Sequence, residues 1–249
     1  MPGSLDGRKV AITGASSGIG EATAELLASE GASVALGARR KDRIDDLAGR
    51  IGDAAHAFEV DVSDEAAARR FVESAAEAMD GLDGLVNNAG VMLLGPVQGA
   101  DTGEWRRMIE VNLLGLLYCT HAAIPLMQDG GGGHVVNVSS VAGRVASLGS
   151  AVYNMTKWGV NGFSEGLRQE VLNSGIRVTI LEPGFVDTEL QGHNEHPLVL
   201  EEIEKMRAKI GDDGLLQAAD MAEAIRYALA QPQRVSVNEM LIRPTGQPR

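Results

Sequence analysis

A tyrosine and a lysine lie four residues apart in the segment "SAVYNMTKWG" (150–159). On a helix this spacing puts Tyr153 and Lys157 on one face. A phenol has a pKa of about 10, so at neutral pH it donates a proton readily but is rarely deprotonated. A neighbouring ammonium favours the phenolate, and lowering the pKa by about three units takes roughly 4 kcal/mol. The pair predicts general acid/base chemistry at Tyr153; an aromatic–cation pair on an amphipathic helix is the alternative.

The glycine-rich stretch "TGASSGIGEA" (13–22) could bind a phosphate, since it lies between a predicted strand and a predicted helix. Gly14, Gly18 and Gly20 permit a tight turn and a close approach of the backbone to a ligand. The start of the helix then offers free N–H groups to a pyrophosphate. Ser16 and Ser17 can add hydroxyl donors. A glycine-rich turn without a ligand is the alternative, but the strand–loop–helix setting favours a dinucleotide.

The end of the following strand, "ALGARRKDR" (35–43), indicates which dinucleotide. NAD-binding folds place an acidic residue about 20 positions after the glycines, where it holds the ribose 2′-hydroxyl. Ala38 occupies that position here, and Arg39 and Arg40 follow it. Guanidinium groups attract a 2′-phosphate, so the strand end predicts NADP(H) in preference to NAD(H). Alternatively the arginines only open a solvated helix, with Arg43 on the surface in both interpretations.

Alternating segments with strand and helix patterns must position these residues. Helical patterns occupy residues 19–31, about 40–50, about 64–79, about 102–128 and about 151–173. Such alternation is typical of right-handed βαβ units. We expect an α/β fold, a Rossmann-type doubly wound parallel sheet of seven strands with helices on both faces. The expected strands are 9–13, 33–38, 55–61, 84–88, 134–139, 177–183 and 237–243.

The stretch from about 187 to 217 departs from this rhythm because it is long, polar and only partly helical. It follows the carboxyl end of a predicted strand, where ligands bind in open α/β sheets. We therefore expect a lid over the substrate. The sequence has neither internal repeats nor a linker, so we expect one nucleotide-binding domain over residues 1–249.

Composition restricts the partners of the chain. A net charge of −12 argues against nucleic acid and against an anionic membrane. The start "MPGSLDGRKV" has no apolar core of a signal peptide, and no uninterrupted apolar run reaches the length of a spanning helix. The single cysteine, Cys119, lies in an apolar run and is expected to be a buried thiol, with a catalytic nucleophile as the alternative. These features fit a cytoplasmic enzyme or binding domain.

Taken in order, the motifs resemble those of the short-chain dehydrogenases/reductases in their short, single-domain form. The resemblance spans nearly the whole chain. Within the family, "GVMLLGPV" (90–97), "RQEV" (168–171), "EPGFVDTEL" (182–190) and "IRPT" (242–245) are most similar to NADPH-dependent carbonyl reductases of the clavulaldehyde-reductase type and to 3-hydroxy-acid dehydrogenases. The matching family motifs are "TGASSGIG" (13–20), "DV" (61–62), "NNAG" (87–90), Asn112 in "VNLLG", "NVSS" (137–140), "YNMTK" (153–157) and "PG" (183–184).

The resemblance implies a reversible NADP(H)-dependent reduction of an aldehyde or ketone to an alcohol. It gives Ser140, which lies 13 residues before Tyr153, the role of holding the substrate oxygen, and Ser139 a structural role. It gives Asn112 a water-holding role in a proton relay from Lys157, which would also bind the nicotinamide ribose. It implies a homotetramer or homodimer. The cofactor contacts that it implies, the glycine motif and the Arg39–Arg40 pair included, are Gly14, Ser16, Ser17, Gly18, Ile19, Gly20, Arg39, Arg40, Asp61, Val62, Asn88, Ala89, Gly90, Tyr153, Lys157, Pro183, Gly184, Val186 and Thr188.

Other interpretations remain at this point. His193 and His196 in "HNEH" could suggest a metal site, but no further ligands complete one, and we expect none. His193 could instead touch substrate from the lid. Arg144 could anchor a substrate carboxylate, although a structural or subunit contact is favoured. For the whole chain the alternatives are a non-catalytic NADP(H)-sensing protein, an NAD-preferring alcohol or hydroxysteroid dehydrogenase, and a sugar-nucleotide epimerase, for which 249 residues leave no substrate domain.

Overall fold

The computed structural model describes residues 5–211 and 214–247. A parallel sheet runs through the centre in the order β3-β2-β1-β4-β5-β6-β7. This is the doubly wound order of a Rossmann-type α/β fold, as predicted. Each strand agrees with its predicted range to within two residues at either end. The strands are β1 (Lys9–Thr13), β2 (Ser33–Ala38), β3 (Ala55–Glu59), β4 (Gly84–Asn87), β5 (Gly133–Val138), β6 (Ile176–Pro183) and β7 (Glu239–Ile242).

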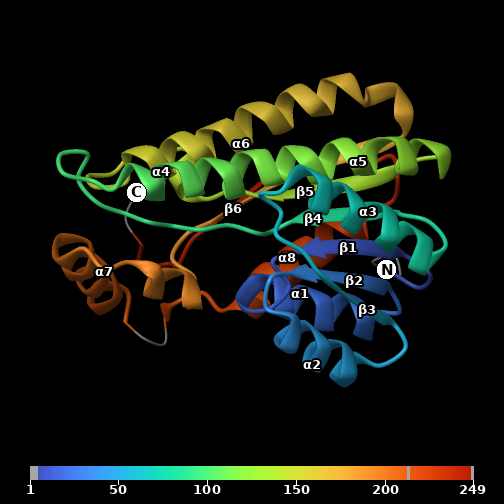
Figure 1. Ribbon diagram of the computed structural model, residues 1–249, viewed down its shortest axis with the longest axis horizontal. Coiled ribbons are helices and arrows are strands. Elements are labelled where there is room, and N and C mark those ends of the chain that lie inside the picture. The colour runs from blue at the N-terminus through green and yellow to red at the C-terminus, as the bar shows by residue number, and fades with distance from the viewer. Residues whose placement is uncertain (1–4, 212–213, 248–249) are drawn as a thin grey trace.

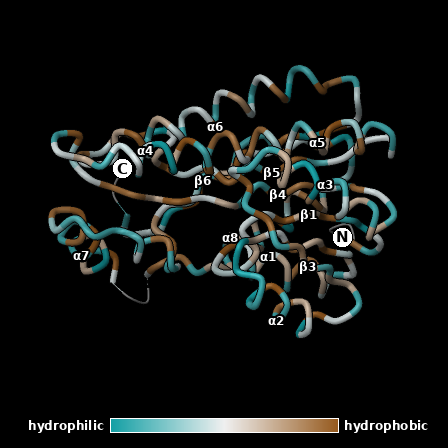
Figure 2. Tube along the Cα trace, viewed as in Figure 1, coloured by the Kyte–Doolittle hydropathy of each residue, from teal (hydrophilic) through white to brown (hydrophobic). Residues whose placement is uncertain are grey.

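Helices cover both faces of the sheet (Figure 1). One face carries α1 (Gly18–Ser29), α2 (Lys41–Ile51) and α8 (Ala218–Leu229), and the other carries α3 (Glu65–Met79), α5 (Leu116–Asp129) and α6 (Ala151–Glu170). Alternate residues of β1 enter the two cores: Val10 and Ile12 pack on the α1 side, and Ala11 on the α3 side. Figure 2 shows this arrangement as hydrophobic residues along the central strands, with hydrophilic residues on outer turns such as those of α2.

The long helix expected over 102–128 has an irregular centre. It consists of α4 (Thr102–Ile109), a π-helical segment (Glu110–Gly115) and α5. Its whole stretch, Thr102–Asp129, is long and apolar enough to cross a membrane by length and composition alone. In the fold, however, α5 packs against α3, β4 and β5, and its buried face includes Cys119 and Met127. The apolar side chains of α5 therefore pack against the sheet.

The sequence analysis assigned no element to residues 218–229, which form α8. A capping box starts this helix: the side chain of Gln217 and the carboxylate of Asp220 bond reciprocally with backbone N–H groups, and Gln217 N donates to Asp220 Oδ2 at 2.7 Å. Met221 and Ile225 are fully buried and belong to the core against which α1 packs. Helix α8 therefore covers this face of the sheet together with α1 and α2.

After β6 the chain leaves the sheet as the lid prediction requires. Thr188 begins a short 3₁₀ turn (Glu189–His193), and α7 (Pro197–Ile210) follows. Val186 forms an isolated parallel bridge with Leu216 on the return path. Residues 212 and 213 of the expected excursion lie outside the described residues. The excursion places the 3₁₀ turn beside the carboxyl ends of the strands.

Candidate active site

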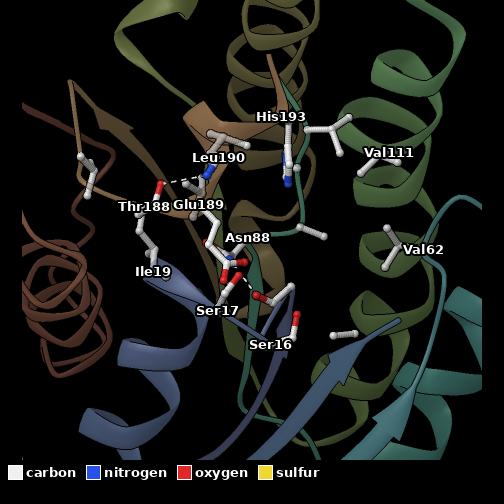
Figure 3. Close-up of a pocket in the computed structure, with 18 of the residues that line it drawn as sticks. Ser16, Ser17, Ile19, Val62, Asn88, Val111, Thr188, Glu189, Leu190 and His193 are labelled. Atoms are coloured by element: carbon white, nitrogen blue, oxygen red, sulfur yellow. Dashed lines mark hydrogen bonds between the residues drawn. The ribbon is translucent and has the colours of Figure 1, made fainter. Parts of the chain in front are cut away.

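A cavity of about 370 Å³ lies at the carboxyl ends of the central strands. It spans the point between β1 and β4 where the strand order reverses, the usual ligand site of such sheets. Figure 3 shows the side chains that surround it. The predicted cofactor residues that line it are Gly14, Ser16, Ser17, Gly18, Ile19, Arg39, Arg40, Asp61, Val62, Asn88, Ala89, Gly90, Tyr153, Lys157, Pro183, Gly184, Val186 and Thr188.

The glycine loop forms the wall where α1 begins. Gly14 and Gly18 have φ values of +69° and +57°, a conformation that favours glycine. Gly20 differs from the prediction because it does not line the cavity. A Cβ on Gly20 would lie 2.4 Å from the carbonyl oxygen of Gly14 and 2.6 Å from Asn88 Nδ2. Its role is therefore close packing between the helix and the loop.

Thr13 and Asn88 join the loops that follow β1 and β4. The hydroxyl of Thr13 accepts hydrogen bonds of 3.0 Å from the N–H groups of Asn88 and Ala89. The Asn88 side chain donates to the carbonyl oxygens of Thr13 at 3.0 Å and Gly14 at 3.2 Å. Sequence reasoning singled out Asn88 but not Thr13, whose role depends on the pairing of distant strands. These bonds fix two cavity walls relative to each other.

Asn87, the first residue of the "NNAG" motif, supports the strands through its side chain. Its side-chain amide donates to Thr120 Oγ1 at 2.9 Å and to Asn137 Oδ1 at 2.8 Å, and all three groups are buried. The Asn137 amide continues the chain of hydrogen bonds to Ser164 on α6 at 2.8 Å. A buried polar network of this kind ties α5 and α6 to the edge of the sheet that carries the site.

The end of β2 presents two arginines to the cavity. Arg39 is exposed, whereas Arg40 donates to both serine hydroxyls of the glycine loop, to Ser16 from Nε at 3.1 Å and to Ser17 from Nη2 at 2.6 Å. Arg40 also pairs with Glu189 at 2.7 Å. The sequence analysis missed Glu189, because the partners lie 149 residues apart and no local pattern links them.

Asp61, a predicted cofactor contact, follows β3 and is exposed at the cavity rim. Its Oδ1 accepts from the N–H and the hydroxyl of Ser63, at 3.0 and 2.7 Å. Burial raises the pKa of this carboxyl, but the Ser63 hydrogen bonds and the charges of Arg39 and Arg107 lower it further, so the net pKa lies below its ordinary value. Asp61 is therefore a fixed anion at neutral pH.

Tyr153 and Ser140 both line the cavity. Tyr153 is buried, and burial raises its pKa to about 12, although a hydrogen bond with the Ser140 side chain acts in the opposite direction. Ser140 begins a short 3₁₀ turn, where its Oγ accepts from the N–H of Ala142 at 3.1 Å. The neighbouring Ser139 is structural, as expected, since its hydroxyl donates to the carbonyl oxygen of Lys157 at 3.2 Å.

The ammonium of Lys157 lies 5.8 Å from the centroid of the Tyr153 ring. It donates to the carbonyl oxygen of Val138 at 2.9 Å, and burial lowers its pKa to about 8. The expected lowering of the Tyr153 pKa by Lys157 is not seen among the protein groups, because desolvation outweighs the other influences on the phenol. At neutral pH the protein groups therefore keep Tyr153 protonated.

Asn112 lies behind the cavity wall, in the π-helical segment, and does not line the cavity. It is 2% exposed, and its side chain bonds to both the N–H and the carbonyl oxygen of Val91. Oδ1 accepts from Val91 N at 2.8 Å and Nδ2 donates to Val91 O at 2.9 Å. Nδ2 also lies 3.2 Å from the hydroxyl of Thr156 on α6. The side chain thus fixes the loop after β4 against the helix that carries Tyr153.

A comparison with protein families identifies the relationship. The model of the short chain dehydrogenases matches residues 8–198, which include every motif described above up to α7. The chain belongs to the short-chain dehydrogenase/reductase family. It is therefore an oxidoreductase of that family, and the predicted resemblance is confirmed at this level.

Relatives of this short-chain dehydrogenase match it over nearly its full length. An uncharacterized oxidoreductase of Staphylococcus saprophyticus is 41% identical, with 96% of each chain covered. Among solved structures, the closed form of a serine dehydrogenase complexed with NADP⁺ is 31% identical, with a TM-score of 0.88 and 96% of each chain covered. A 3-ketoacyl-(acyl-carrier-protein) reductase from Brucella melitensis complexed with NADH is 32% identical, with a TM-score of 0.86, covering 97% of this chain and 99% of the other.

Two side chains that sequence reasoning left open in this short-chain dehydrogenase are now placed. His193 lines the cavity, and its ring points into it (Figure 3). Arg144 lies elsewhere: its Nε donates to Glu182 at 2.6 Å, and its Nη2 pairs with Glu239 at 2.5 Å. Glu182 is fully buried, so Arg144 compensates a buried carboxylate. The favoured structural role of Arg144 agrees with this geometry, and a substrate-carboxylate role does not.

Cys119 is a buried free thiol in this short-chain dehydrogenase, as predicted. Burial raises its pKa to about 12. A thiol with such a pKa stays protonated at neutral pH, and the thiolate is the reactive form of cysteine. Cys119 also does not line the cavity. The alternative of a cysteine nucleophile therefore disagrees with both its chemistry and its position.

Proposed function

We propose that this chain reversibly reduces an aldehyde or ketone to an alcohol with NADP(H). One observation carries the proposal. Tyr153 and Ser140 border the same cavity as the glycine loop and Arg40. A proton donor, a hydroxyl that can hold a carbonyl oxygen and a glycine-rich loop that can bind phosphate thus border one cavity. These are the groups that hydride reduction of a carbonyl requires from the protein.

The residues present fit a nicotinamide dinucleotide. Gly14 and Gly18 border the cavity without a side chain, so a ligand can approach their backbone closely. The N-terminus of α1 begins at Gly18 and offers N–H groups to a pyrophosphate. Thr188 and the backbone from Pro183 to Val186 line the opposite side, where they would hold the carboxamide. When bound, the cofactor supplies the hydride.

Preference for NADP(H) follows from the end of β2. Ala38 brings no carboxylate to the position that would hold a ribose 2′-hydroxyl, while Arg39, Arg40 and Ser16 line the cavity there. The serine dehydrogenase that resembles this chain was solved with NADP⁺, and the ketoacyl reductase with NADH. These two solved structures differ in the cofactor that they contain. Our assignment of NADP(H) therefore rests on Arg39 and Arg40.

The proposed proton path begins at Tyr153. With a pKa of about 12, the phenol is protonated at neutral pH and can donate to the carbonyl oxygen as hydride arrives. Ser140 would hold that oxygen and stabilise its developing charge. Lys157, buried beside the ring, would bind the ribose hydroxyls and favour the phenolate that remains. The family resemblance also gives Asn112 a water-holding role in the relay from Lys157, although its side-chain amide is bonded to Val91 and Thr156 here.

For the assembly we propose a homotetramer, with a homodimer as the smaller possibility. The outer face of α6 carries Met155 and Trp158, whose exposed fractions are 51% and 54%. Large apolar side chains exposed on a helix favour contact with a second copy. The expected cytoplasmic location stays a prediction. Light scattering coupled to size-exclusion chromatography measures the assembly directly, and a monomer would contradict the proposal.

Turnover with a panel of aldehydes, ketones and 3-oxo acids tests the proposed activity. NADPH consumption should be observed with at least one member, and more efficiently than NADH consumption. Tyr153→Phe should abolish turnover while NADPH binding persists, because the ring packing is kept and only the proton donor is lost. Tyr227→Phe, at an exposed tyrosine on α8, is the matched control. Binding of NADPH without turnover of any member would favour a cofactor-sensing protein, and an equal preference for NADH would contradict the cofactor assignment.

A further inference from the structure

The carboxylate of Glu189 is shared between Arg40, which lines the opposite cavity wall, and Arg43 in the first turn of α2. Its Oε2 lies 2.7 Å from Arg40 Nη1, and its Oε1 lies 2.7 Å from Arg43 Nη1. Each oxygen therefore has its own guanidinium. Glu189 lines the cavity, and Figure 3 shows its side chain directed toward the serines of the glycine loop. The proposed reaction gives this carboxylate no task.

Glu189 belongs to a strap, residues 188–194, that is fastened at both ends. At the far end Asn194 is 6% exposed, and its Oδ1 accepts from the N–H of Leu94 at 2.8 Å. At the near end the two ion pairs join Glu189 to the start of α2. Their side chains are 41% to 48% exposed, so solvent weakens these contacts. The strap is thus held firmly beside the loop after β4 and loosely beside the glycine loop.

Arg40 directs Nε and Nη2 toward the two serine hydroxyls of the glycine loop. Nε and Nη2 lie 3.1 and 3.0 Å from Ser16 Oγ, and Nη2 lies 2.6 Å from Ser17 Oγ. A guanidinium and two hydroxyls next to one another are the donors that a phosphomonoester takes. An anion bound there would share Arg40 with the carboxylate of Glu189, and the two negative groups would repel each other.

We propose that Glu189 is a specificity-determining residue for the cofactor: its carboxylate occupies Arg40 and competes with the 2′-phosphate of NADP(H). A bound 2′-phosphate takes Arg40, and Glu189 is left on Arg43 alone. A cofactor without that phosphate leaves both ion pairs intact. Glu189 therefore reduces the preference of the chain for NADP(H) over NAD(H), and Arg43 limits this effect by holding the displaced carboxylate. This inference rests on the proposed use of NADP(H).

The dissociation constants of NADPH and NADH, measured by calorimetry at low salt, test the competition. Glu189→Gln keeps the size of the side chain and removes its charge. It should tighten NADPH about three- to fivefold, the size of one exposed ion-pair interaction, and leave NADH within about twofold. The gain should shrink as salt is added. Glu195→Gln makes the same charge change on an exposed residue just beyond the strap and should alter neither constant.

Arg43→Gln provides an independent check through a double-mutant cycle. It should weaken NADPH binding in the parent chain, because Glu189 then has no other arginine to pair with and competes more strongly for Arg40. The same substitution should weaken NADPH binding less in the Glu189→Gln background. Equal effects in the two backgrounds would overturn the proposed coupling. An NADPH preference in the parent chain with no change in Glu189→Gln would overturn this inference alone. Equal binding of NADH and NADPH by the parent chain would instead overturn the cofactor assignment beneath it.

Discussion

The glycine loop and the strap face each other across one cavity, but different interactions hold them. On the loop side, Gly20 packs against the Gly14 carbonyl, and the Asn88 amide bonds to the backbone of residues 13 and 14. On the strap side, ion pairs between half-exposed side chains join Glu189 to Arg40 and Arg43 at the start of α2. Packing and short-range hydrogen bonds resist displacement, whereas exposed ion pairs contribute little and are screened by salt. The difference indicates a fixed phosphate cradle opposed by a wall that can yield.

The largest expected effect concerns two adjacent serines that follow β5. Ser140→Ala should lower kcat about 100- to 1,000-fold, because the hydroxyl that stabilises the developing oxyanion is lost. Ser139→Ala is the matched control, since its hydroxyl bonds only to the Lys157 carbonyl. It should lower the free energy of unfolding by about 1 kcal/mol with a much smaller loss of kcat. Steady-state kinetics and urea unfolding separate the two, and similar kcat values for both variants would contradict the assigned roles.

A glycine pair tests how tightly the cradle is packed. Gly20→Ala should lower the free energy of unfolding by roughly 3 kcal/mol, because its Cβ would clash with the Gly14 carbonyl. Cofactor affinity should fall as well, as the loop shifts. Gly49→Ala, on the exposed face of α2 with nothing within 4 Å of the new Cβ, should instead stabilise the chain by about 1 kcal/mol. Urea unfolding of both variants is the measurement. A tolerated Gly20→Ala would show that the loop is not held by packing.

Acid should weaken the sheet while the strap's ion pairs remain charged. His134 is buried, with Nε2 2.7 Å from Thr179 Oγ1, and burial together with the charges of Arg177 and Arg8 lowers its pKa to about 3. The pKa of a histidine in the unfolded chain is about 6.5. As the pH falls below this value toward 3, the unfolded chain binds a proton that the folded chain does not, so the fold loses stability. The free energy of unfolding should therefore fall by about 2 kcal/mol between pH 7 and pH 5.

His134→Asn should remove most of this slope, as urea unfolding at the two pH values would reveal. The strap should not contribute, because hydrogen bonds from Arg40 and Arg43 lower the pKa of Glu189 to about 2. Its carboxylate stays charged throughout this range. An unchanged slope in His134→Asn would assign the acid sensitivity to another group.

The smallest expected effect concerns the firm end of the strap. Asn194→Ala removes the acceptor for the Leu94 N–H. It should lower the free energy of local opening of the strap by about 1 kcal/mol. Amide hydrogen exchange of residues 188–194 should quicken about fivefold, while exchange in the glycine loop stays unchanged. Asn238→Ala, near β7 and away from the cavity, is a control of the same type. Faster exchange in both walls would mean that they open together.

Much of the fold was predictable because its signals are local. Short β-branched runs and helical periodicity placed all seven strands, and the motif order placed Tyr153, Lys157 and Ser140 on one cavity. The pairing of Glu189 with Arg40 and Arg43 was not predictable, since a charged residue in a polar segment carries no sign of its distant partner. The pKa of Tyr153 also depends on burial by residues from several elements. Helix α8 was overlooked, although its Gln217–Asp220 cap is a local signal.

The π-helical segment that carries Asn112 behaves as a stored one-residue insertion. Deleting one residue from 110–115 would restore a continuous α-helix and leave α5 in its present phase. Cys119 and Met127 would keep facing the sheet, whereas a one-residue deletion in the regular first turn of α5 would rotate both by about 100°. The π-helical segment therefore places Asn112 without disturbing the core, so a change of length there alters the active site and spares the packing of the sheet.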